Sequence, residues 1–440
     1  MSELSYLEKL MDGVEVEWLP LSKVFNLRNG YTPSKTKKEF WANGDIPWFR
    51  MDDIRENGRI LGNSLQKISS CAVKGGKLFP ENSILISTSA TIGEHALITV
   101  PHLANQRFTC LALKESYADC FDIKFLFYYC FSLAEWCRKN TTMSSFASVD
   151  MDGFKKFLIP RPCPDNPEKS LAIQSEIVRI LDKFTALTAE LTAELTAELN
   201  MRKKQYNYYR DQLLSFDEEQ EKPIYLKKLL DGVEVEWKTL EDISIKISSG
   251  GTPKTGVSEF YDGDIPWLRT QEVNFCDIWD TEVKITESGV KNSSAKWIPK
   301  NCVIVAMYGA TVGKIGINKI PMTTNQACAN IQLNEEVAHY RYVFHFLCSQ
   351  YTYIKSLGTG SQTNINAQIV KNIKIPIPCP DNPEKSLAIQ SEIVRILDKF
   401  DTLTNSITEG LPREIELRQK QYEYYRDLLF SFPKPETVSN

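Results

Sequence analysis

The sequence predicts an α+β protein with an internal duplication. It consists of two globular α+β domains separated by two long antiparallel coiled-coil helices, in a pseudo-twofold repeat. Three observations predict this fold class: segments recur in both halves, two stretches have coiled-coil spacing, and the blocks between them mix strand-like and helical patterns. The expected boundaries are 1–160 for the first domain, 161–216 for the first spacer, 217–376 for the second domain, and 377–440 for the second spacer and tail.

The duplication is carried by nearly identical segments. "YLEKLMDGVEVEW" (6–18) returns as "YLKKLLDGVEVEW" (225–237), and "CPDNPEKSLAIQSEIVRILDKF" (163–184) returns without change at 379–400. Between these segments only short islands match, namely "GDIPWFR" (44–50) with "GDIPWLR" (263–269), "ATIG" (90–93) with "ATVG" (310–313), and Asn105-Gln106 with Asn325-Gln326. Repetition of this kind indicates two copies of one structural unit whose domains have diverged.

The repeated 22-residue segment predicts the start of a long helix. Asn166 suits the N-cap, Pro167 the first helical position, and Glu168 the positive helix end. Apolar residues then alternate in steps of four and three as far as Leu191 and Ile407, which predicts a coiled-coil seam, and from there the seam continues in steps of four. The seam residues are Ile173, Ile177, Ile180, Phe184, Leu187, Leu191, Leu195 and Leu199 in the first copy, and Ile389, Ile393, Ile396, Phe400, Leu403 and Ile407 in the second. Gly410 and Pro412 predict a kink or break in the second helix.

Chain connectivity predicts the direction of these helices. The second domain leaves the end of the first helix and enters the start of the second, so a compact domain brings these two ends together. The helices are therefore expected to run antiparallel, as a spacer between two domains. Because segment 6–18 copies the segment that follows the first helix, we expect it to pack against the end of the second.

The two domain blocks read as α+β. "NSILISTSATIGEHALITV" and "NCVIVAMYGATVGKIGI" are strand-like runs broken by glycine turns, whereas "FDIKFLFYYCFSLAEWCRK" and "VAHYRYVFHFLCSQYTYIKS" are typical of helices with aromatic residues for the core. Hydrophobic content of 42% and charged content of 25% are typical of soluble globular proteins. We expect no signal peptide and no membrane span. Eleven cysteines without a Cys-x-x-Cys pair, and only four histidines, predict a cytoplasmic, metal-free protein.

The net charge of −4 is unevenly distributed. Residues 19–160 hold 18 Lys and Arg against 13 Asp and Glu, and residues 238–377 hold 14 against 12. The rest of the chain holds 20 against 31. Because nucleic-acid binding needs local positive charge, two basic blocks in an acidic frame are compatible with DNA as partner. The acidic helices are better suited to protein partners, and repeated copies of one surface predict two copies of one partner.

The whole chain resembles the specificity (S) subunit of type I restriction-modification systems. The resemblance rests on the paired variable blocks, the repeated spacers, "LTAELTAELTAELNMRKKQYNYYRDQLLSF" and "LRQKQYEYYRDLLFSF", and it points to the subgroup with Thr-Ala-Glu-Leu spacer repeats. It implies that each variable block is a target recognition domain that reads one half of an asymmetric, double-stranded DNA site. It also implies that the helices dock two modification (methyltransferase) subunits, with restriction subunits in the full complex. The resemblance puts S-adenosylmethionine, ATP and magnesium on the partner subunits and no cofactor on this chain.

The residues themselves favour a non-catalytic role. No Asn/Asp-Pro-Pro-Tyr/Phe motif for amino-methyl transfer occurs. "GATVGKI" (309–315) resembles a phosphate loop but is one residue short, and its copy "SATIGEH" (89–95) has Glu in place of Lys. The main alternative is a coiled-coil scaffold with two binding modules that do not recognise DNA, and the enzyme alternative is a self-sufficient nuclease or methyltransferase.

The duplication separates two kinds of candidate DNA-binding residue. Positions identical in both halves cannot distinguish two different half-sites, so they serve the scaffold or contact phosphates. We expect Trp48 and Trp267 to be buried rather than stacked on DNA. Arg50 and Arg269 suit either phosphate contact or a structural ion pair. The "ATIG" and "ATVG" turns suit close backbone approach to DNA or a plain turn. The shared Asn-Gln pairs suit local backbone contacts more than adenine edges.

Base readers are expected where the halves differ, although a solvated loop remains the alternative for each residue. Divergent positions include "TPSKTKK" (32–38), Glu94 opposite Lys314, and "SSFASVD" (144–150) opposite "GSQTNIN" (360–366). The full set of candidates is Thr32, Ser34, Lys35, Lys37, Arg50, Thr88, Thr91, His95, Gln106, Arg107 and Ser148 in the first block, and Thr252, Lys254, Arg269, Tyr308, Thr311, Lys314, Gln326, Gln362, Asn364 and Asn366 in the second.

Three consecutive Thr-Ala-Glu-Leu repeats occupy residues 188–199. Each repeat adds about 6 Å of rise and about 40° of rotation to a helix. One base pair of B-DNA advances about 3.4 Å and turns about 34–36°. The rotations nearly match, so we expect the repeat number to set the gap between half-sites. The alternative is a slipped DNA repeat tolerated in an exposed helix.

Overall fold

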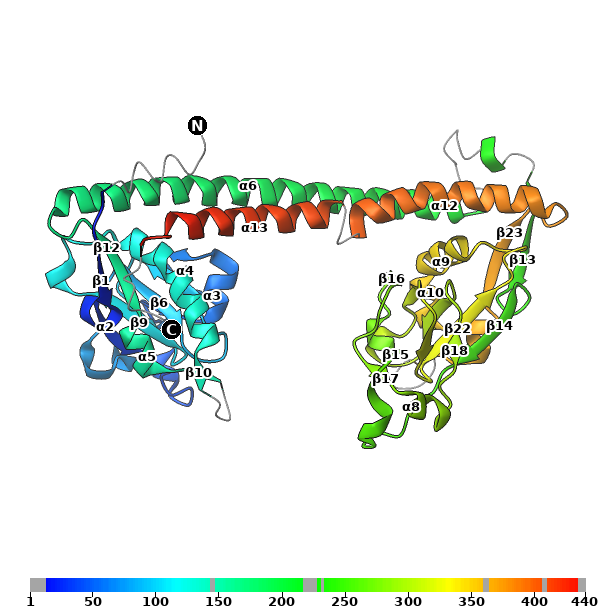
Figure 1. The fold of residues 1–440 in the computed structure, drawn as a ribbon, viewed down its shortest axis with the longest axis horizontal. Coiled ribbons are helices and arrows are strands. Elements are labelled where there is room, and N and C mark those ends of the chain that lie inside the picture. Colours follow the sequence, from blue (N-terminus) through cyan, green and yellow to red (C-terminus); the bar gives the residue numbers. More distant parts are fainter. Residues whose placement is uncertain are drawn as a thin grey trace. The chain divides into compact units, whose positions relative to one another are not determined.

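The computed structural model describes residues 13–142, 147–216, 228–230, 233–358, 364–405 and 410–433. The chain divides into two compact units, Met1–Leu191 with Leu417–Asn440 (unit 1) and Thr192–Glu416 (unit 2). These limits differ from the boundaries expected from the sequence, because each spacer contributes its first part to one unit and its last part to the other. The α+β class and the internal duplication are confirmed (Figure 1).

Unit 1 is built on a five-stranded sheet of order β2-β9-β6-β7-β4. Its strands are Phe25–Asn29, Phe108–Leu113, Ser83–Ser87, His95–Ile98 and Ile60–Leu61, in that order. The central pairs are antiparallel, with Ile84 opposite both Leu111 and Leu97, whereas β4 joins β7 in parallel. β6 and β7 are buried along their whole length, as their runs of apolar residues predict.

Unit 2 repeats this sheet with the order β14-β22-β19-β20-β16. The strands are Ser244–Ser249, Cys328–Leu333, Val303–Ala306, Ile315–Asn318 and Cys276–Ile278. β16 joins β20 in parallel, as β4 joins β7 in unit 1. The "ATIG" and "ATVG" islands lie in equivalent turns of these sheets, between β6 and β7 in unit 1 and between β19 and β20 in unit 2.

Each unit also has a smaller sheet and a two-stranded ribbon. The smaller sheets have the orders β5-β3-β8 and β17-β15-β21-β18. Their strands are β5 Lys67–Ile68, β3 Ile46–Phe49 and β8 Leu103–Ala104 in unit 1, and β17 Lys284–Ile285, β15 Tyr261–Leu268, β21 Met322–Thr324 and β18 Trp297–Ile298 in unit 2. The ribbons pair β1 (Val16–Pro20) with β12 (Leu158–Pro162), and β13 (Val235–Thr239) with β23 (Lys374–Pro378). Short elements complete the units: α2 Leu21–Val24, α3 Met51–Asn57, β10 Thr141–Thr142, β11 Ser148–Val149, α5 Met151–Lys156, α8 Glu287–Lys291, α10 Tyr351–Ser356 and α11 Ala367–Lys371.

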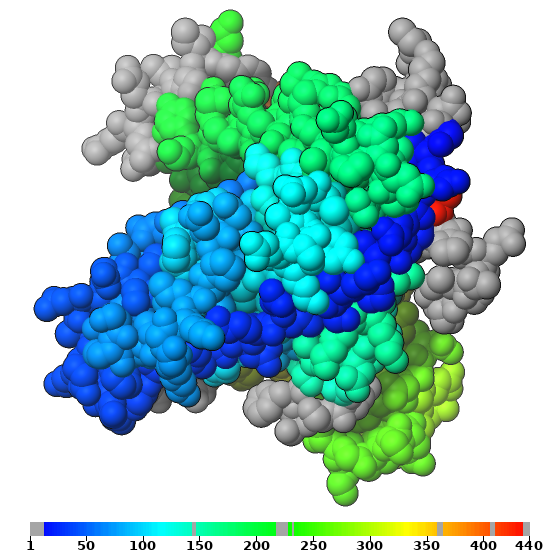
Figure 2. Space-filling model, turned by 90° about the vertical axis from the view of Figure 1, so that its left-hand side faces the viewer, coloured from blue at the N-terminus to red at the C-terminus, as the bar shows by residue number. Residues whose placement is uncertain are grey.

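One aromatic helix fills the core of each unit, as the sequence predicts. α4 (Ile123–Lys139) packs in unit 1 and α9 (Tyr340–Ser349) in unit 2. The core around α4 includes sheet residues, the start of the long helix and Phe430 near the C-terminus, whose ring lies 5.4 Å from that of Phe125. Unit 1 is therefore completed by the C-terminal segment. Figure 2 shows that residues of the first third of the chain, in blue, cover much of its surface in that view.

The first long helix, α6, runs from Pro167 to Leu214 without interruption and contains the Thr-Ala-Glu-Leu repeats. The second is divided into α12 (Pro383–Asn405) and α13 (Leu411–Leu429), with Gly410 at a φ of 84° before α13. Separate helices on either side of Gly410 confirm the expected break. Asn166 and Asn382 accept hydrogen bonds from the backbone three residues later, at 3.0 Å in both copies, as expected for N-caps.

Within each unit the two spacer helices lie side by side and run in opposite directions (Figure 1). In unit 1, Phe184 packs against Tyr425 with ring centroids 5.6 Å apart. In unit 2, Tyr209 stacks on Phe400 at 5.4 Å. The opening segment was expected to pack against the end of the second helix. Trp18 Nε1 donates a 3.0 Å hydrogen bond to the carbonyl of Pro433, whereas residues 6–12 lie outside the described part.

The predicted seam residues take several environments. Ile173, Ile177, Ile389 and Ile393 are buried, but against the core of their own unit. The seam pattern missed Val178 and Leu181, which share this face, and placed Leu187 in an interface although it is 51% exposed. Ile180, Phe184, Leu191, Leu195, Leu199, Ile396, Phe400 and Leu403 are half-buried, and Ile407 lies outside the described residues. The helix start therefore faces the domain core, which offers more apolar surface than the facing helix.

Candidate nucleic-acid interface

The two shared tryptophans belong to the scaffold. Trp48 and Trp267 are the next-to-last residues of the equivalent strands β3 and β15 and are 3% and 5% exposed, which confirms their expected burial. Each indole Nε1 donates to a backbone carbonyl, Trp48 to Tyr31 at 3.0 Å and Trp267 to Gly251 at 2.9 Å. These bonds fix the loop that begins with Thr-Pro in each unit beside the smaller sheet.

Arg50 and Arg269 follow these tryptophans and differ in their partners. The backbone N–H of Arg50 donates to Asp53 at 2.6 Å, and that of Arg269 to Glu272 at 3.2 Å. The Arg269 guanidinium pairs with Glu282 at 2.9 Å and lies 3.7 Å from Glu272. The Arg50 guanidinium lies 3.5 Å from the half-exposed Asp52. The Arg269 guanidinium is therefore neutralised by local carboxylates. The Arg50 guanidinium has only a longer contact with one carboxylate, so it is better able to bind a ligand.

The shared Asn-Gln pairs hold loops together in the same way in both units. Asn105 Oδ1 accepts the backbone N–H of Arg107 at 3.0 Å, and Asn325 Oδ1 accepts that of Ala327 at 3.1 Å. These contacts confirm the expected local role of the asparagines. The side-chain oxygen of Gln106 accepts a hydrogen bond from Thr32, and that of Gln326 from Thr252. In each unit this hydrogen bond joins two loops that are far apart in the sequence.

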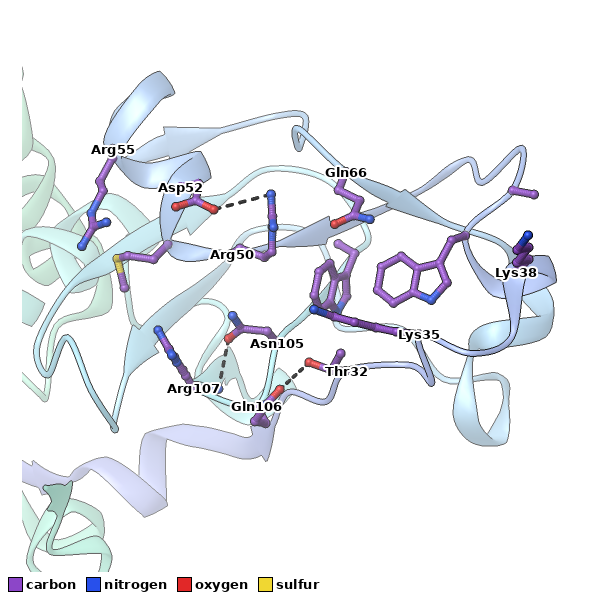
Figure 3. A pocket seen from close by; sticks show the side chains of 14 residues that line it. Thr32, Lys35, Lys38, Arg50, Asp52, Arg55, Gln66, Asn105, Gln106 and Arg107 are labelled. Carbon is purple, nitrogen blue, oxygen red and sulfur yellow. Dashed lines mark hydrogen bonds and ion pairs between the residues drawn. The ribbon is translucent and has the colours of Figure 1, made fainter. Parts of the chain in front are cut away.

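In unit 1 these two loops lie beside a basic hollow of about 890 Å³ (Figure 3). The basic hollow is lined by Thr32, Lys35, Lys38, Trp41, Ala42, Trp48, Arg50, Met51, Asp52, Arg55, Gln66, Asn105, Gln106 and Arg107. Five of these side chains are cations and one is a carboxylate. Lys35 extends its ammonium group toward the middle of the hollow (Figure 3). Positive charge, amides and an open shape together suit a polyanion with hydrogen-bonding base edges.

The corresponding surface of unit 2 has different chemistry. The loops 32–40 and 252–260 have equal length between matched Thr-Pro and Glu-Phe pairs, so positions correspond one to one. Ser258 stands in place of Lys38, Asn274 in place of Arg55, and Ala327 in place of Arg107. Lys35 corresponds to Thr255, and Ser34 to the exposed Lys254. The same scaffold therefore carries a strongly basic lining in one unit and a mostly neutral, polar lining in the other.

His95 corrects the sequence-based expectation. It was a candidate DNA contact, but its side chain is fully buried, with its ring 4.5 Å from that of Phe131. Burial, reinforced by the nearby Arg59, lowers its pKa from 6.5 to about 3. All of β7 is buried, so the neutral imidazole at position 95 fills the core and does not face DNA.

Asn366 has a local role in the structure and is exposed. Its Oδ1 accepts the backbone N–H of Ile369 at 2.9 Å, so it is the N-cap of α11. An Asn before a short helix has this role more often than base contact. Asn364 is half-buried nearby, and Gln362 lies outside the described residues.

The remaining candidate residues are exposed on these loops or make local contacts. Ser34 and Lys37 are exposed, Ser34 bonds Thr36, and Lys37 lies over the ring of Phe40. Thr88 bonds Thr109, Ser148 bonds Thr142, and the buried hydroxyl of Thr91 has no hydrogen-bond partner in the described part. In unit 2, Tyr308 is 39% exposed, Thr311 donates to the Thr270 carbonyl, and Lys314 donates to Asn274 at 2.8 Å.

Sequence reasoning did not single out Lys38, Arg55 or Gln66, which line the basic hollow. Lys38 was within the loop 32–38, but only its neighbours were named. Arg55 lies one helical turn after Met51 on α3, directly after the matched "GDIPW" island. A search for charges one turn beyond each island could have found it.

Neither a metal site nor a membrane helix was found in the described part of the chain. No three His, Cys, Asp or Glu side chains come together there in a way that could hold a metal ion. No helix in the same ranges is long and apolar enough to cross a membrane.

Comparison with known proteins gives a consistent result. Residues 13–201 and 232–417 match the family described as type I restriction modification DNA specificity domain. The chain is similar to the type I restriction enzyme EcoprrI specificity subunit of Escherichia coli, with 61% identity and 93% of each chain covered. It is also similar to the EcoR124I/EcoR124II specificity subunit of the same species, with 42% identity over the full length of both. A solved structure described for complex assembly and conformational transition of the type I R-M system covers 94% of this chain and 97% of its own, with 14% identity and a TM-score of 0.61, which shows a common fold.

Proposed function

The chain belongs to the type I restriction-modification DNA specificity family, and we propose that unit 1 and unit 2 each read one half of an asymmetric, double-stranded DNA site. The observation that carries this proposal is a matched scaffold with mismatched linings. Trp48 and Trp267 make the same backbone bond, whereas Arg107 and Ala327 occupy equivalent positions with different chemistry. Two readers of unlike sequences need a common frame and different contacts.

The basic hollow of unit 1 supplies the donors that base readout requires. Arginine can donate to guanine O6 and N7 with two parallel hydrogen bonds, and lysine to the same acceptors as a point charge. Lys35 and Arg107 enter the hollow from different loops and make no ion pair among the described residues. We assign base contact to these two and phosphate contact to Arg50, whose position is shared by both units and so carries no sequence information.

DNA binding by the assembled complex tests the proposed function. Affinity for duplex DNA that contains the methylated site is measured across a salt series, and the logarithm of affinity is expected to fall linearly with the logarithm of salt concentration. The same complex with a scrambled duplex is the control for specificity. Binding that is independent of salt and of sequence would favour a scaffold with modules that do not recognise DNA.

We assign the chain to the subgroup with Thr-Ala-Glu-Leu repeats and propose that their number sets the gap between the half-sites. The three repeats at 188–199 lie within α6, whose helical hydrogen bonding continues through them. Thr196 donates to the carbonyl of Thr192 at 2.6 Å, which satisfies one repeated hydroxyl inside the helix. A change of four residues preserves the helix while it changes its length by about 6 Å and its phase by about 40°.

We further propose that two modification subunits dock on a repeated helical surface, defined by Met201 and Tyr208 on α6 and by Leu417 and Tyr424 on α13. These residues correspond between the two copies. All four are exposed, Met201 46%, Tyr208 55%, Leu417 42% and Tyr424 63%. A spacing of seven places each pair on one helix face, and exposed aromatic residues are typical of protein interfaces. Two copies of one surface suit two copies of one partner.

On this proposal the chain recognises DNA and does not catalyse. S-adenosylmethionine, ATP and magnesium belong to the modification and restriction subunits, which supply methyl transfer, translocation and cleavage. Cytoplasmic localisation and reduced thiols stay predictions of the sequence. Methyl transfer by the purified chain alone, with labelled S-adenosylmethionine, would contradict this assignment.

A further inference from the structure

A second hollow in unit 1, which we call the arginine hollow, lies next to the basic hollow and has a different character. It measures about 490 Å³ and is lined by Ile54, Arg55, Gly58, Arg59, Thr91, Ile92, Glu94 and Arg138. Arg55 lines both hollows, so the two are adjacent at this side chain. Neither the shared islands nor the divergent loops of the sequence drew attention to Arg59 or Arg138.

The charges of the arginine hollow are only partly neutralised. Arg59 pairs with Glu94 at 2.8 Å and donates to the carbonyl of His95 at 3.1 Å, so this arginine and the only carboxylate of the lining cancel. Arg55 and Arg138 are exposed and make no ion pair among the described residues. The lining thus retains two net positive charges beside the basic hollow.

A glycine makes room for one of these arginines. Gly93 has a φ of 90°, and a Cβ at this position would lie 2.8 Å from Arg138 Nη1 and from the carbonyl of Ala134. The turn that closes "ATIG" therefore allows the guanidinium from the end of α4 to lie against the backbone. This contact connects a conserved turn of the duplication with a cation from a different element.

Unit 2 keeps this arrangement of charge with different residues. Gly313 is the equivalent glycine, with a φ of 79°, and a Cβ there would lie nearest to the backbone of Lys355 and the ring of Tyr351, both in α10. Lys314 follows it and donates to Asn274, the residue at the position of Arg55. Lys355 is exposed and makes no ion pair among the described residues. Lys355 stands at the position of Arg138, as Arg341 and His345 stand at those of Lys124 and Tyr128. One cationic position is therefore shared, and Lys314 adds a second positive charge where unit 1 has Glu94.

Positive charge is kept beside the glycine turn in both units, whereas the charge of the basic hollow changes between the units. A base reader must change its chemistry when its half-site changes, whereas a phosphate ligand needs only positive charge. We propose that the glycine turn with Arg55 and Arg138 in unit 1, and with Lys314 and Lys355 in unit 2, binds a DNA phosphate that positions each reader on its half-site. This inference rests on the proposed function and names a phosphodiester oxyanion as the ligand.

The test uses the full-length chain in its assembled complex, with duplex DNA across a salt series. Arg138→Gln and Lys355→Gln are each expected to reduce the salt slope by about 1, and to weaken binding to all sequences alike. Arg138→Lys is expected to restore the slope, because a phosphate contact needs charge more than guanidinium geometry. Lys139→Gln, which removes the neighbouring exposed cation outside the hollow, is the matched control.

The outcomes separate this inference from the proposed function. If the wild-type complex shows no salt-dependent, site-specific binding, both the proposed function and the phosphate inference are contradicted. If the wild type binds specifically but Arg138→Gln behaves like Lys139→Gln, only the phosphate assignment is overturned. A change in the methylated sequence with Arg138→Gln would also overturn it, because it would identify a base reader. Stabilisation of the wild type but not of Arg138→Gln by inorganic phosphate, with an unchanged salt slope on DNA, would indicate a free-phosphate site and contradict the proposal.

Discussion

Arg341 holds Asp398 through two hydrogen bonds, from Nη2 at 2.7 Å and from Nε at 2.9 Å, and thereby fastens α9 of the reading domain to α12 of the spacer. His345 adds a third contact to the same carboxylate oxygen at 2.7 Å. Asp182, the copy of Asp398 in the first spacer, is held by Lys124 at 2.7 Å and Tyr128 at 2.8 Å. A spacer carboxylate present in both copies is thus bound by divergent residues of each domain.

Asp398→Ala is expected to destabilise unit 2 by about 2 kcal/mol. This is less than the about 3–5 kcal/mol for breaking a fully buried pair, because about a third of the Asp398 side chain is exposed. Equilibrium unfolding in denaturant measures the change, with Lys399→Ala, an exposed neighbour, as control. Equal stability of these two variants would show that the contact does not fasten the domain.

The contribution of Asp398 also depends on pH. Burial alone would raise the pKa of this carboxyl, but hydrogen bonds from His345 and Arg341 outweigh burial and lower the pKa below its ordinary 3.8. A lowered carboxyl pKa gives stability that is present above the unfolded-state value and is lost as pH falls through the folded-state value. The stability difference between wild type and Asp398→Ala should therefore narrow only below pH of about 4.

His95→Ile tests the buried histidine with the residue that unit 2 carries at the equivalent position, Ile315. The His95 pKa of about 3 in the folded state means that the unfolded chain binds one more proton between pH of about 6.5 and 3. As pH is lowered through this range, this group should reduce the unfolding free energy of the wild type by up to about 1.4 kcal/mol per pH unit. The variant should lack this contribution. Identical pH dependence of the two unfolding free energies would contradict the neutral buried imidazole.

Tyr208→Ala and Tyr424→Ala test the repeated docking surface. Each single variant removes one of two equivalent exposed aromatics, so each is expected to retain one modification subunit, and the double variant none. Native mass spectrometry of the complex gives the stoichiometry. Tyr353→Ala, at a similarly exposed tyrosine on α10 that is not part of this repeated surface, is expected to retain both. Loss of both partner copies in either single variant would show that the sites are not independent.

Deletion of Thr192–Leu195 tests the spacer repeat. The helix loses one four-residue unit, about 40° of rotation, which nearly equals the twist of one base pair. Methylome sequencing is expected to show a gap shortened by one base pair with both half-sites retained. Thr192→Ala, which keeps the length, should leave the gap as in the wild type. An unaltered gap after the deletion would favour a slipped repeat without function.

The features predictable from sequence were those set by local chemistry. Asn166 and Asn382 cap their helices, Gly410 separates α12 from α13, and Trp48 and Trp267 are buried, each as a short motif indicates. Features set by tertiary packing were missed. The buried face of α6 turns toward the domain core, where Val178 and Leu181 pack, because α4 supplies more apolar surface than the facing helix.

The candidate site shows the same division. The comparison of the two halves predicted the local role of the shared asparagines, which the structure confirms. It did not show that the whole of β7, including its first residue, is buried. His95 was therefore misplaced. Arg55 and Arg138 were not singled out because they come together with the "ATIG" turn only in three dimensions, from α3 and from the end of α4.

The most direct test of the two-reader account is the methylated sequence of Arg107→Ala, which gives unit 1 the residue that unit 2 has at this position. Loss of a two-bond base contact costs about 1–3 kcal/mol of discrimination. Methylome sequencing is expected to show relaxed specificity at one position of one half-site, with the other half-site and the gap as in the wild type. Lys156→Ala, an exposed cation outside both hollows, should change neither half-site. Altered specificity in both half-sites with Arg107→Ala would contradict two independent readers.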